Sequence, residues 1–302
     1  MLTDSVADPD EYANFRNNAA YTNAGISVVL SNALSLLPSL PTSLRPAAAA
    51  QKAWQKIASK ITVLTDAASG IVLEYDGFNG STAVKQADVV LLTYPLEYNQ
   101  SAAQGTADLD FYALATSPSG PGMTYSVFSI DASALSTAGC ASWTYALAAS
   151  QPYARAPFFQ FSEQTTDAYA TNGGTNPAFT FLTAHGGFLQ SFTHGFTGYR
   201  SRTRAFYLDP VLPVQLPAYT VRGMRWLDSV FDVALTTKAT TITRRSGAAG
   251  TAPVEIGSGA KKGTYKLKVG ESLVVPTRAT SGTLVPGSEF SASPPRTPAD
   301  VR

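Results

Sequence analysis

The side chains that could do chemistry in this chain are mainly carboxylates, amides, aromatic rings and lysines. One cysteine, Cys140, excludes a disulfide framework, and with His185 and His194 as the only histidines a transition-metal site is hard to build. The sequence contains no G-x-S-x-G turn, Walker loop or G-x-G-x-x-G, so serine-hydrolase chemistry and nucleotide cofactors have no support. Two carboxyl groups with stacking and hydrogen-bonding surfaces suit glycosidic bond cleavage, and we expect neither a metal nor an organic cofactor.

The overall composition fits that interpretation. Only 14% of the 302 residues are charged and the net charge is +1, so no basic field exists to bind nucleic acid. The low-charge surface, with N-x-S triplets at Asn79 and Asn99, is typical of secreted glycoproteins. Residues 1–10 are acidic and polar and do not form a signal peptide. The apolar stretch Ile26–Leu37 is expected to be a core helix, too short and too polar to span a membrane.

The first 206 residues are expected to be helical. Asp8-Pro-Asp-Glu11 is typical of a helix start. A long loop at 152–183 is expected to be functional because long loops in compact domains usually are. Short strands are expected at 61–64 and 71–75. Hydrophobic periodicity predicts helices at 26–37, 51–60, 84–94, 106–116, 125–135, 141–150 and 187–200.

The pattern changes to alternation after Tyr207. It predicts strands at 220–227, 230–235, 240–244, 265–269 and 272–276. We therefore expect a helical domain over 1–206, a small β domain over 207–277 and a disordered tail over 278–302.

Several ordered blocks of this sequence resemble glycoside hydrolase family 65, in its fungal acid trehalase branch. The resemblance runs from about residue 8 to about residue 276. It is carried by Asp8-Pro-Asp-Glu-Tyr12, Asn17-Asn18, Tyr21-Thr-Asn23, Leu73-Glu-Tyr-Asp-Gly77, Lys85-Gln-Ala-Asp-Val-Val90, Phe158-Phe-Gln-Phe-Ser-Glu-Gln164, Asn172-Gly-Gly-Thr-Asn-Pro177, Phe181-Leu-Thr-Ala-His-Gly-Gly187 and Asp209-Pro-Val-Leu-Pro213.

The resemblance implies part of an (α/α)6 six-hairpin toroid followed by a small β-sandwich domain, and an inverting glycosidase. Glu11 would be the general acid and Glu163 the general base that activates water. Their carboxyl groups would lie about 6.5–9.5 Å apart. The implied substrate-binding residues are Lys85, Gln86, Tyr12, Asn18 and His185. The implied reaction is hydrolysis of the disaccharide α,α-trehalose to two glucose molecules, outside the cell, in the cell wall or in the vacuole.

Two alternatives stay open. One is an α-glucoside phosphorylase of the same family, although a carboxylate at Glu163 favours water over phosphate as the nucleophile. The other is a truncated, non-catalytic remnant, because family members carry a large N-terminal domain and further helices before the acid block. A partial toroid would leave apolar helix faces exposed. Each residue also has a structural alternative: Glu11 as a first-turn acid, Glu163 as a solvated loop residue, Lys85 as a surface lysine.

Overall fold

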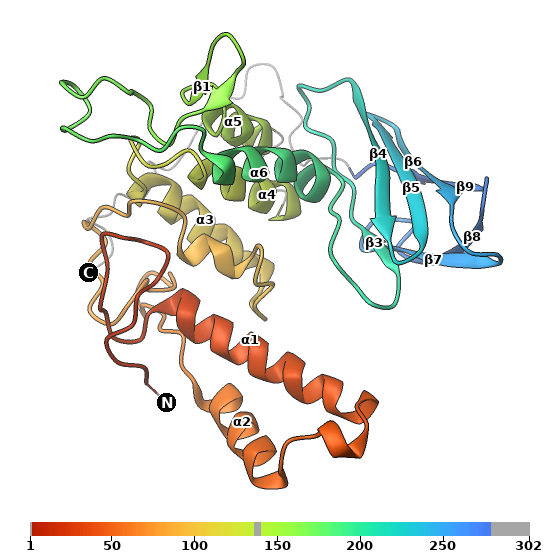
Figure 1. Cartoon of the computed structure of the whole chain (residues 1–302), viewed down its shortest axis with the longest axis horizontal. Coiled ribbons are helices and arrows are strands. Elements are labelled where there is room, and N and C mark those ends of the chain that lie inside the picture. The colour runs from red at the N-terminus through yellow and green to blue at the C-terminus, as the bar shows by residue number, and fades with distance from the viewer. Residues whose placement is uncertain (1, 136–139, 279–302) are drawn as a thin grey trace. The chain divides into compact units, whose positions relative to one another are not determined.

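The computed structural model describes residues 2–135 and 140–278, so the predicted tail lies almost wholly outside the described residues. Two units are present, divided between Pro121 and Gly122. The first is built on the helices α1 (Ala20–Leu36) and α2 (Ala48–Lys60), which pack against each other (Figure 1). Short 3-10 turns, η1 (Leu37–Ser39) and η2 (Thr42–Leu44), join them. The two helices predicted here are confirmed, with α1 starting six residues earlier than expected.

Polar side chains tie α1 to the end of α2. Asn23 donates from Nδ2 to the carbonyl oxygen of Thr62 at 2.7 Å, and Ser27 donates from Oγ to that of Ala58 at 3.2 Å. Together with η1, α1 forms a 20-residue segment, Ala20–Ser39, that is long and apolar enough to cross a membrane by length and composition. The prediction that this stretch is too short is therefore wrong. Its apolar side chains are also more exposed than a core helix requires, with Val29 at 64% and Leu36 at 57%.

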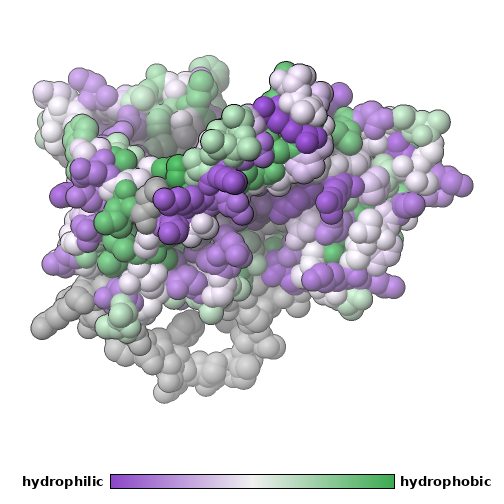
Figure 2. All heavy atoms as spheres, turned by 90° about the horizontal axis from the view of Figure 1, so that it is seen from below, coloured by the Kyte–Doolittle hydropathy of each residue, from purple (hydrophilic) through white to green (hydrophobic). Residues whose placement is uncertain are grey.

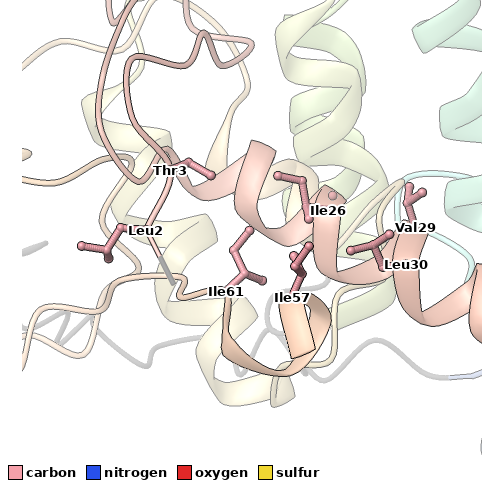
Figure 3. Close-up of a pocket in the computed structure, with 8 residues that line it drawn as sticks. Leu2, Thr3, Ile26, Val29, Leu30, Ile57 and Ile61 are labelled. Carbon is pink, nitrogen blue, oxygen red and sulfur yellow. The ribbon is translucent and has the colours of Figure 1, made fainter. Parts of the chain in front are cut away.

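An apolar groove runs between these two helices (Figure 3). Ile26 of α1 and Ile57 of α2 point toward each other across it. The other lining residues are Leu2, Thr3, Gly25, Val29, Leu30 and Ile61, and the volume is about 510 Å³. An exposed apolar face of this kind is expected of a partial toroid. On the face shown in Figure 2, hydrophilic and apolar residues are otherwise interspersed.

The start of α1 explains why the predicted helix at Asp8 does not form. Residues 9–17 make turns instead, and Asp8 accepts hydrogen bonds from the N–H groups of Tyr21 at 3.1 Å and Thr22 at 3.0 Å. These are unsatisfied donors of the first turn of α1, whose own N-cap residue, Ala19, makes no side-chain cap. The sequence therefore contains the expected capping acid, but Asp8 caps a helix that starts twelve residues later.

Replacing Asp8 by alanine is expected to destabilise the N-terminal end of α1 by about 1–2 kcal/mol, as for other lost N-caps. Hydrogen exchange at Tyr21 and Thr22, followed by mass spectrometry, measures this directly. Asp8→Asn should retain most of the protection because an amide oxygen also accepts hydrogen bonds. Asp4→Ala is the control, since Asp4 is exposed. Equal exchange in the Asp8→Ala and Asp4→Ala variants would contradict the role given to Asp8.

The rest of the first unit surrounds helix α3 (Ala102–Ala115), whose prediction at 106–116 is confirmed. The predicted helix at 84–94 is wrong: only a 3-10 turn forms, η3 (Val89–Leu92). The carbonyl oxygen of Val84, which a helix would bond to the N–H of Asp88, accepts the N–H of Ser117 instead. The N–H of Val84 bonds to the carbonyl oxygen of Ala115. The strands predicted at 61–64 and 71–75 are also wrong, because they reduce to one bridge between Thr65 and Val72.

The second unit begins with three helices, α4 (Thr124–Leu135), α5 (Ala141–Ala148) and α6 (Leu182–Gln190). The first two match their predictions. The third starts five residues earlier than predicted and ends in a π-helical turn, η4 (Ser191–Phe196). The loop expected at 152–183 is present and contains only two-residue strands, β1 (Ala154–Arg155) and β2 (Gln160–Phe161).

A β-sandwich follows (Figure 1). One sheet has the order β3-β7-β8 and the other β4-β5-β6-β9. Buried side chains from both sheets form one core, including Phe206 and Phe231, whose rings stack at 4.3 Å. The strands are β3 (Phe206–Leu208), β4 (Ala218–Trp226), β5 (Ser229–Thr236), β6 (Ala239–Ser246), β7 (Thr251–Ile256), β8 (Gly263–Lys268) and β9 (Ser272–Pro276). Five of these were predicted, and the fold class, helices followed by a small β-sandwich, is confirmed.

The sandwich buries one charged side chain, that of Arg244 on β6, which is 2% exposed. Its guanidinium donates to the carbonyl oxygens of Gly250 at 2.7 Å, Ala248 at 2.9 Å and Leu267 at 3.2 Å. It also donates to Oγ of Ser229 at 3.2 Å. Arg244 therefore donates to the exposed β6–β7 turn and to the buried carbonyl oxygen of Leu267 on β8.

Candidate active site

Residues 3–18, which we term the acid loop, fold back on themselves to present Glu11. Val6 and Arg16 exchange two backbone hydrogen bonds of 2.9 Å, which closes the loop. Asn18 is 2% exposed, has a φ of 54°, and accepts the N–H of Thr3 at 3.1 Å through Oδ1. Tyr12, at the tip, is 59% exposed. Of the two loop residues that the resemblance implies for substrate binding, Tyr12 is thus accessible and Asn18 supports the loop.

Asp10 anchors this loop to the segment around Lys85. One carboxylate oxygen, Oδ1, accepts the N–H of Tyr12 at 3.1 Å and the N–H of Lys85 at 2.8 Å. The N–H of Asp10 in turn donates to Oδ2 of Asp88 at 3.0 Å. Gln86 donates from Nε2 to the carbonyl oxygen of Pro9 at 2.6 Å and is 5% exposed. The role of Gln86 as a ligand of glucose stays a prediction, since here its side chain is buried beneath the loop.

The two residues with the sharpest predicted roles in this unit, Glu11 and Lys85, form an ion pair through Oε2 and Nζ. The Glu11 side chain is 60% exposed and that of Lys85 is 26% exposed. They are 74 residues apart in sequence. The fold therefore brings a solvent-accessible carboxylate against a lysine, and their roles as general acid and sugar ligand stay predictions.

Behind Glu11 lies a cluster of buried carboxyl groups that sequence reasoning missed. Asp8, Asp10, Glu74 and Asp88 are each between 1% and 9% exposed. Burial, and then the charges of Asp88 and Asp10, raise the pKa of Glu74 to about 10. Burial also raises the pKa of Asp88 and of Asp8 above their ordinary values. The sequence did contain a signal for this cluster. Two of its acids lie within the blocks 73–77 and 85–90 that carry the family resemblance, but no role was assigned to their carboxyl groups.

Glu163 is half-buried at the base of the long loop in the second unit. Its Oε2 accepts the N–H of Ala178 at 2.8 Å, and its own N–H donates to the carbonyl oxygen of Ala178 at 3.0 Å. Nearby, Arg155 pairs with Asp167 at 2.7 Å, and Asp167 accepts Oγ–H of Ser162 at 2.5 Å. The N–H of Ala178 thus holds Glu163 by one carboxylate oxygen, and the role of Glu163 as general base stays a prediction.

His185 lies beside this loop, and both of its ring nitrogens are engaged in hydrogen bonds. Its Nε2 accepts the N–H of Phe161 at 3.2 Å, so Nδ1 is the donor to the carbonyl oxygen of Phe181 at 2.9 Å. The ring also stacks on that of Phe161 at 4.7 Å. His185 therefore supports the strand that leads into Glu163, and its substrate-binding role stays a prediction.

The structure brings some of the predicted site residues together within each unit. Glu11, Lys85, Gln86, Tyr12 and Asn18 meet in the first unit, while Glu163 and His185 lie close in the second. The carboxyl separation that an inverting mechanism requires stays a prediction. Within 2–135 and 140–278, no group of three or more His, Cys, Asp or Glu side chains is arranged to hold a metal ion.

The structure defines a helical part followed by a C-terminal β-sandwich, and comparisons with known proteins place it among the glycoside hydrolases. Residues 199–257 match the family described as glycosyl hydrolase family 65, C-terminal domain. The chain is 37% identical to a cell wall acid trehalase of Arthroderma benhamiae, over 96% of this chain and 28% of that protein. It is 43% identical to an acid trehalase of Emericella nidulans, over 74% of this chain and 20% of that protein.

A solved structure described as "Putative kojibiose phosphorylase from human microbiome" aligns with a TM-score of 0.66 at 16% identity. The alignment covers 91% of this chain and 39% of that one, and shows the shared fold. The chain belongs to glycosyl hydrolase family 65, and fungal acid trehalases are among its relatives. It spans between a fifth and just over a quarter of the length of those two trehalases.

Proposed function

We propose that this protein hydrolyses α,α-trehalose to two glucose molecules by inversion, with Glu11 as general acid and Glu163 as general base. The observation that supports it most is the similarity to two fungal acid trehalases, over 96% and 74% of this chain. The side chain of Glu11 is 60% exposed, so a substrate can reach its carboxyl group.

The acid step requires Glu11 to be protonated and free of Lys85. A glucose unit entering the site would bind Lys85 through its hydroxyl groups and separate the ion pair. Glu11 then protonates the bridging oxygen while the bond to the anomeric carbon breaks. Lys85 is well placed for this exchange because its N–H is fixed on Asp10 while its side chain reaches Glu11.

The base step uses the second carboxylate. With Oε2 of Glu163 held by the N–H of Ala178, Oε1 removes a proton from a water molecule that attacks the anomeric carbon from the opposite face. Attack with inversion yields β-glucose from the cleaved unit and α-glucose from the leaving unit. The cell wall location in the name of the Arthroderma benhamiae relative supports an extracellular or cell wall site of action.

Hydrolysis and phosphorolysis predict different products. Incubating the intact protein from its source with trehalose should release free glucose, in equal amounts of both anomers at early times, at a rate independent of inorganic phosphate. Proton NMR distinguishes the anomers before mutarotation. Glucose 1-phosphate formed in a phosphate-dependent manner would overturn hydrolysis in favour of the phosphorylase alternative, and no turnover in either buffer would favour a non-catalytic remnant.

A further inference from the structure

Glu74 is the buried carboxyl group behind the acid loop that no described donor satisfies. It is 1% exposed, and neither of its oxygens accepts a hydrogen bond from an N–H or hydroxyl group among the described residues. The other three acids have such partners: Asp8 caps α1, Asp10 bridges Tyr12 and Lys85, and Asp88 accepts the N–H of Asp10. An ionised Glu74 in this place would be a buried charge without compensation.

The neighbour that can satisfy Glu74 is Asp10. A side-chain hydrogen bond to Asp10 is among the causes that raise the pKa of Glu74, after burial and the charges of Asp88 and Asp10. Two carboxylates cannot bond, since both are acceptors, so the contact requires that one of the pair carries a proton. Asp10 uses Oδ1 for the N–H groups of Tyr12 and Lys85, which leaves Oδ2 for the proton.

We propose that a proton shared between Asp10 and Glu74 positions Glu11, by holding the Asp10 carboxyl group in the orientation that binds the N–H groups of Tyr12 and Lys85 together. Asp10 and Glu74 are positioning residues, since neither reaches the substrate. The part of this inference that concerns catalysis rests on the proposed hydrolysis of trehalose. The part that concerns the shared proton does not.

The groups around the pair favour its protonated form. Asp8 and Asp88 add negative charge, and burial keeps the hydroxyl groups of Tyr75 and Tyr112 neutral by raising their pKa. The cations near the loop are engaged elsewhere: Lys85 pairs with Glu11, and Arg16 lies 4.8 Å from the centre of the Tyr75 ring. Tyr21 faces Asp8 and Asp88, and their charges help to raise its pKa.

The shared proton gives the loop a defined dependence on pH. Because the pKa of Glu74 is raised to about 10 in the folded protein, the folded state keeps a proton that an unfolded chain releases above its ordinary value of 4.5. The stabilising contribution is complete below that value and is lost as the pH rises toward 10. Within this range the unfolding equilibrium constant should rise by up to about tenfold per pH unit.

The test replaces the proton by a permanent N–H donor. In Glu74→Gln the amide donates to Asp10, and in Asp10→Asn the side-chain oxygen still accepts both N–H groups while Nδ2 donates to Glu74. Both variants of the intact protein should therefore keep kcat within a few-fold of wild type at acidic pH, with less loss of stability at neutral pH. Asp10→Ala and Glu74→Ala should lower kcat by about a hundred-fold, through misplacement of Glu11.

Two further readouts do not use trehalose. Urea unfolding of each variant between pH 4 and 8 should show that Glu74→Gln and Asp10→Asn flatten the pH dependence, while the exposed control Asp4→Asn keeps it. Infrared difference spectra should show a protonated-carboxyl band in wild type that is absent from Glu74→Gln. An unchanged band or pH slope in Glu74→Gln, or amide variants as impaired as the alanine ones, would overturn the shared proton. A normal slope and band without trehalose turnover would instead count against the proposed function alone.

Discussion

Replacing Glu11 by glutamine is expected to lower kcat for trehalose by between about a hundred-fold and ten-thousand-fold, the range for loss of a general acid. The change removes the transferable proton and keeps the shape of a 60% exposed side chain. KM should change little, because the variant keeps the loop that Asp10 holds. Steady-state glucose release by the intact protein measures both constants, with Glu255→Gln on β7 as the matched control.

A substrate that needs no acid separates the two carboxylates. α-Glucosyl fluoride loses fluoride without protonation, so Glu11→Gln should hydrolyse it at nearly the wild-type rate. Glu163→Gln should fail on both substrates, because no base activates the water. Wild-type turnover of trehalose by Glu11→Gln, or of α-glucosyl fluoride by Glu163→Gln, would refute the corresponding role.

Replacing Arg244 by methionine is expected to destabilise the β-sandwich by about 3–5 kcal/mol. The buried carbonyl oxygen of Leu267 and the buried hydroxyl group of Ser229 lose their donor, at about 1–3 kcal/mol each. The exposed β6–β7 turn loses two further hydrogen bonds. Backbone carbonyls cannot be removed with the arginine, so an apolar substitute brings no compensation. Fluorescence of Trp226, which is buried in the same core, monitors the loss during urea unfolding.

The next residue supplies the control for Arg244. Arg245 is 63% exposed and its guanidinium lies 3.5 Å from the carboxylate of Asp232. Arg245→Met should therefore change stability by less than about 1 kcal/mol, as for surface ion pairs in general. A similar loss in both variants would show that the hydrogen bonds of Arg244 do not stabilise the sandwich.

Hydrophobic periodicity was sufficient to predict elements whose formation depends on their own residues rather than on distant parts of the chain. It predicted α2, α3, α4 and α5, since the backbone hydrogen bonds of a helix lie within one continuous segment. It also predicted the strands of the four-stranded sheet, which alternate between buried and exposed positions. It missed β7, where Pro253 interrupts the pattern, and β3, which has only three residues and pairs in parallel with β7.

The predictions of secondary structure are wrong where hydrogen bonds to residues far away in the sequence determine the backbone conformation. Residues 84–94 have a helical pattern, but Val84 bonds to Ala115 and Lys85 bonds to Asp10. The acidic start at Asp8 has the residues of a helix cap, yet it caps α1 across the acid loop. For the same reason the sequence could suggest that Glu11 and Lys85 belong to one site but not that they form an ion pair.

The hydrogen bonds that hold the acid loop around Glu11 also set the order in which parts of the site can form during folding. Asp10 with Lys85, Pro9 with Gln86, and Asp10 with Asp88 are separated by 75, 77 and 78 residues. Closing such long loops is slow relative to forming a helix. During synthesis the residues around Glu11 stay without these anchors until residue 88 has left the ribosome. The anchoring of this carboxylate therefore waits for a segment that lies at least 74 residues further along the chain.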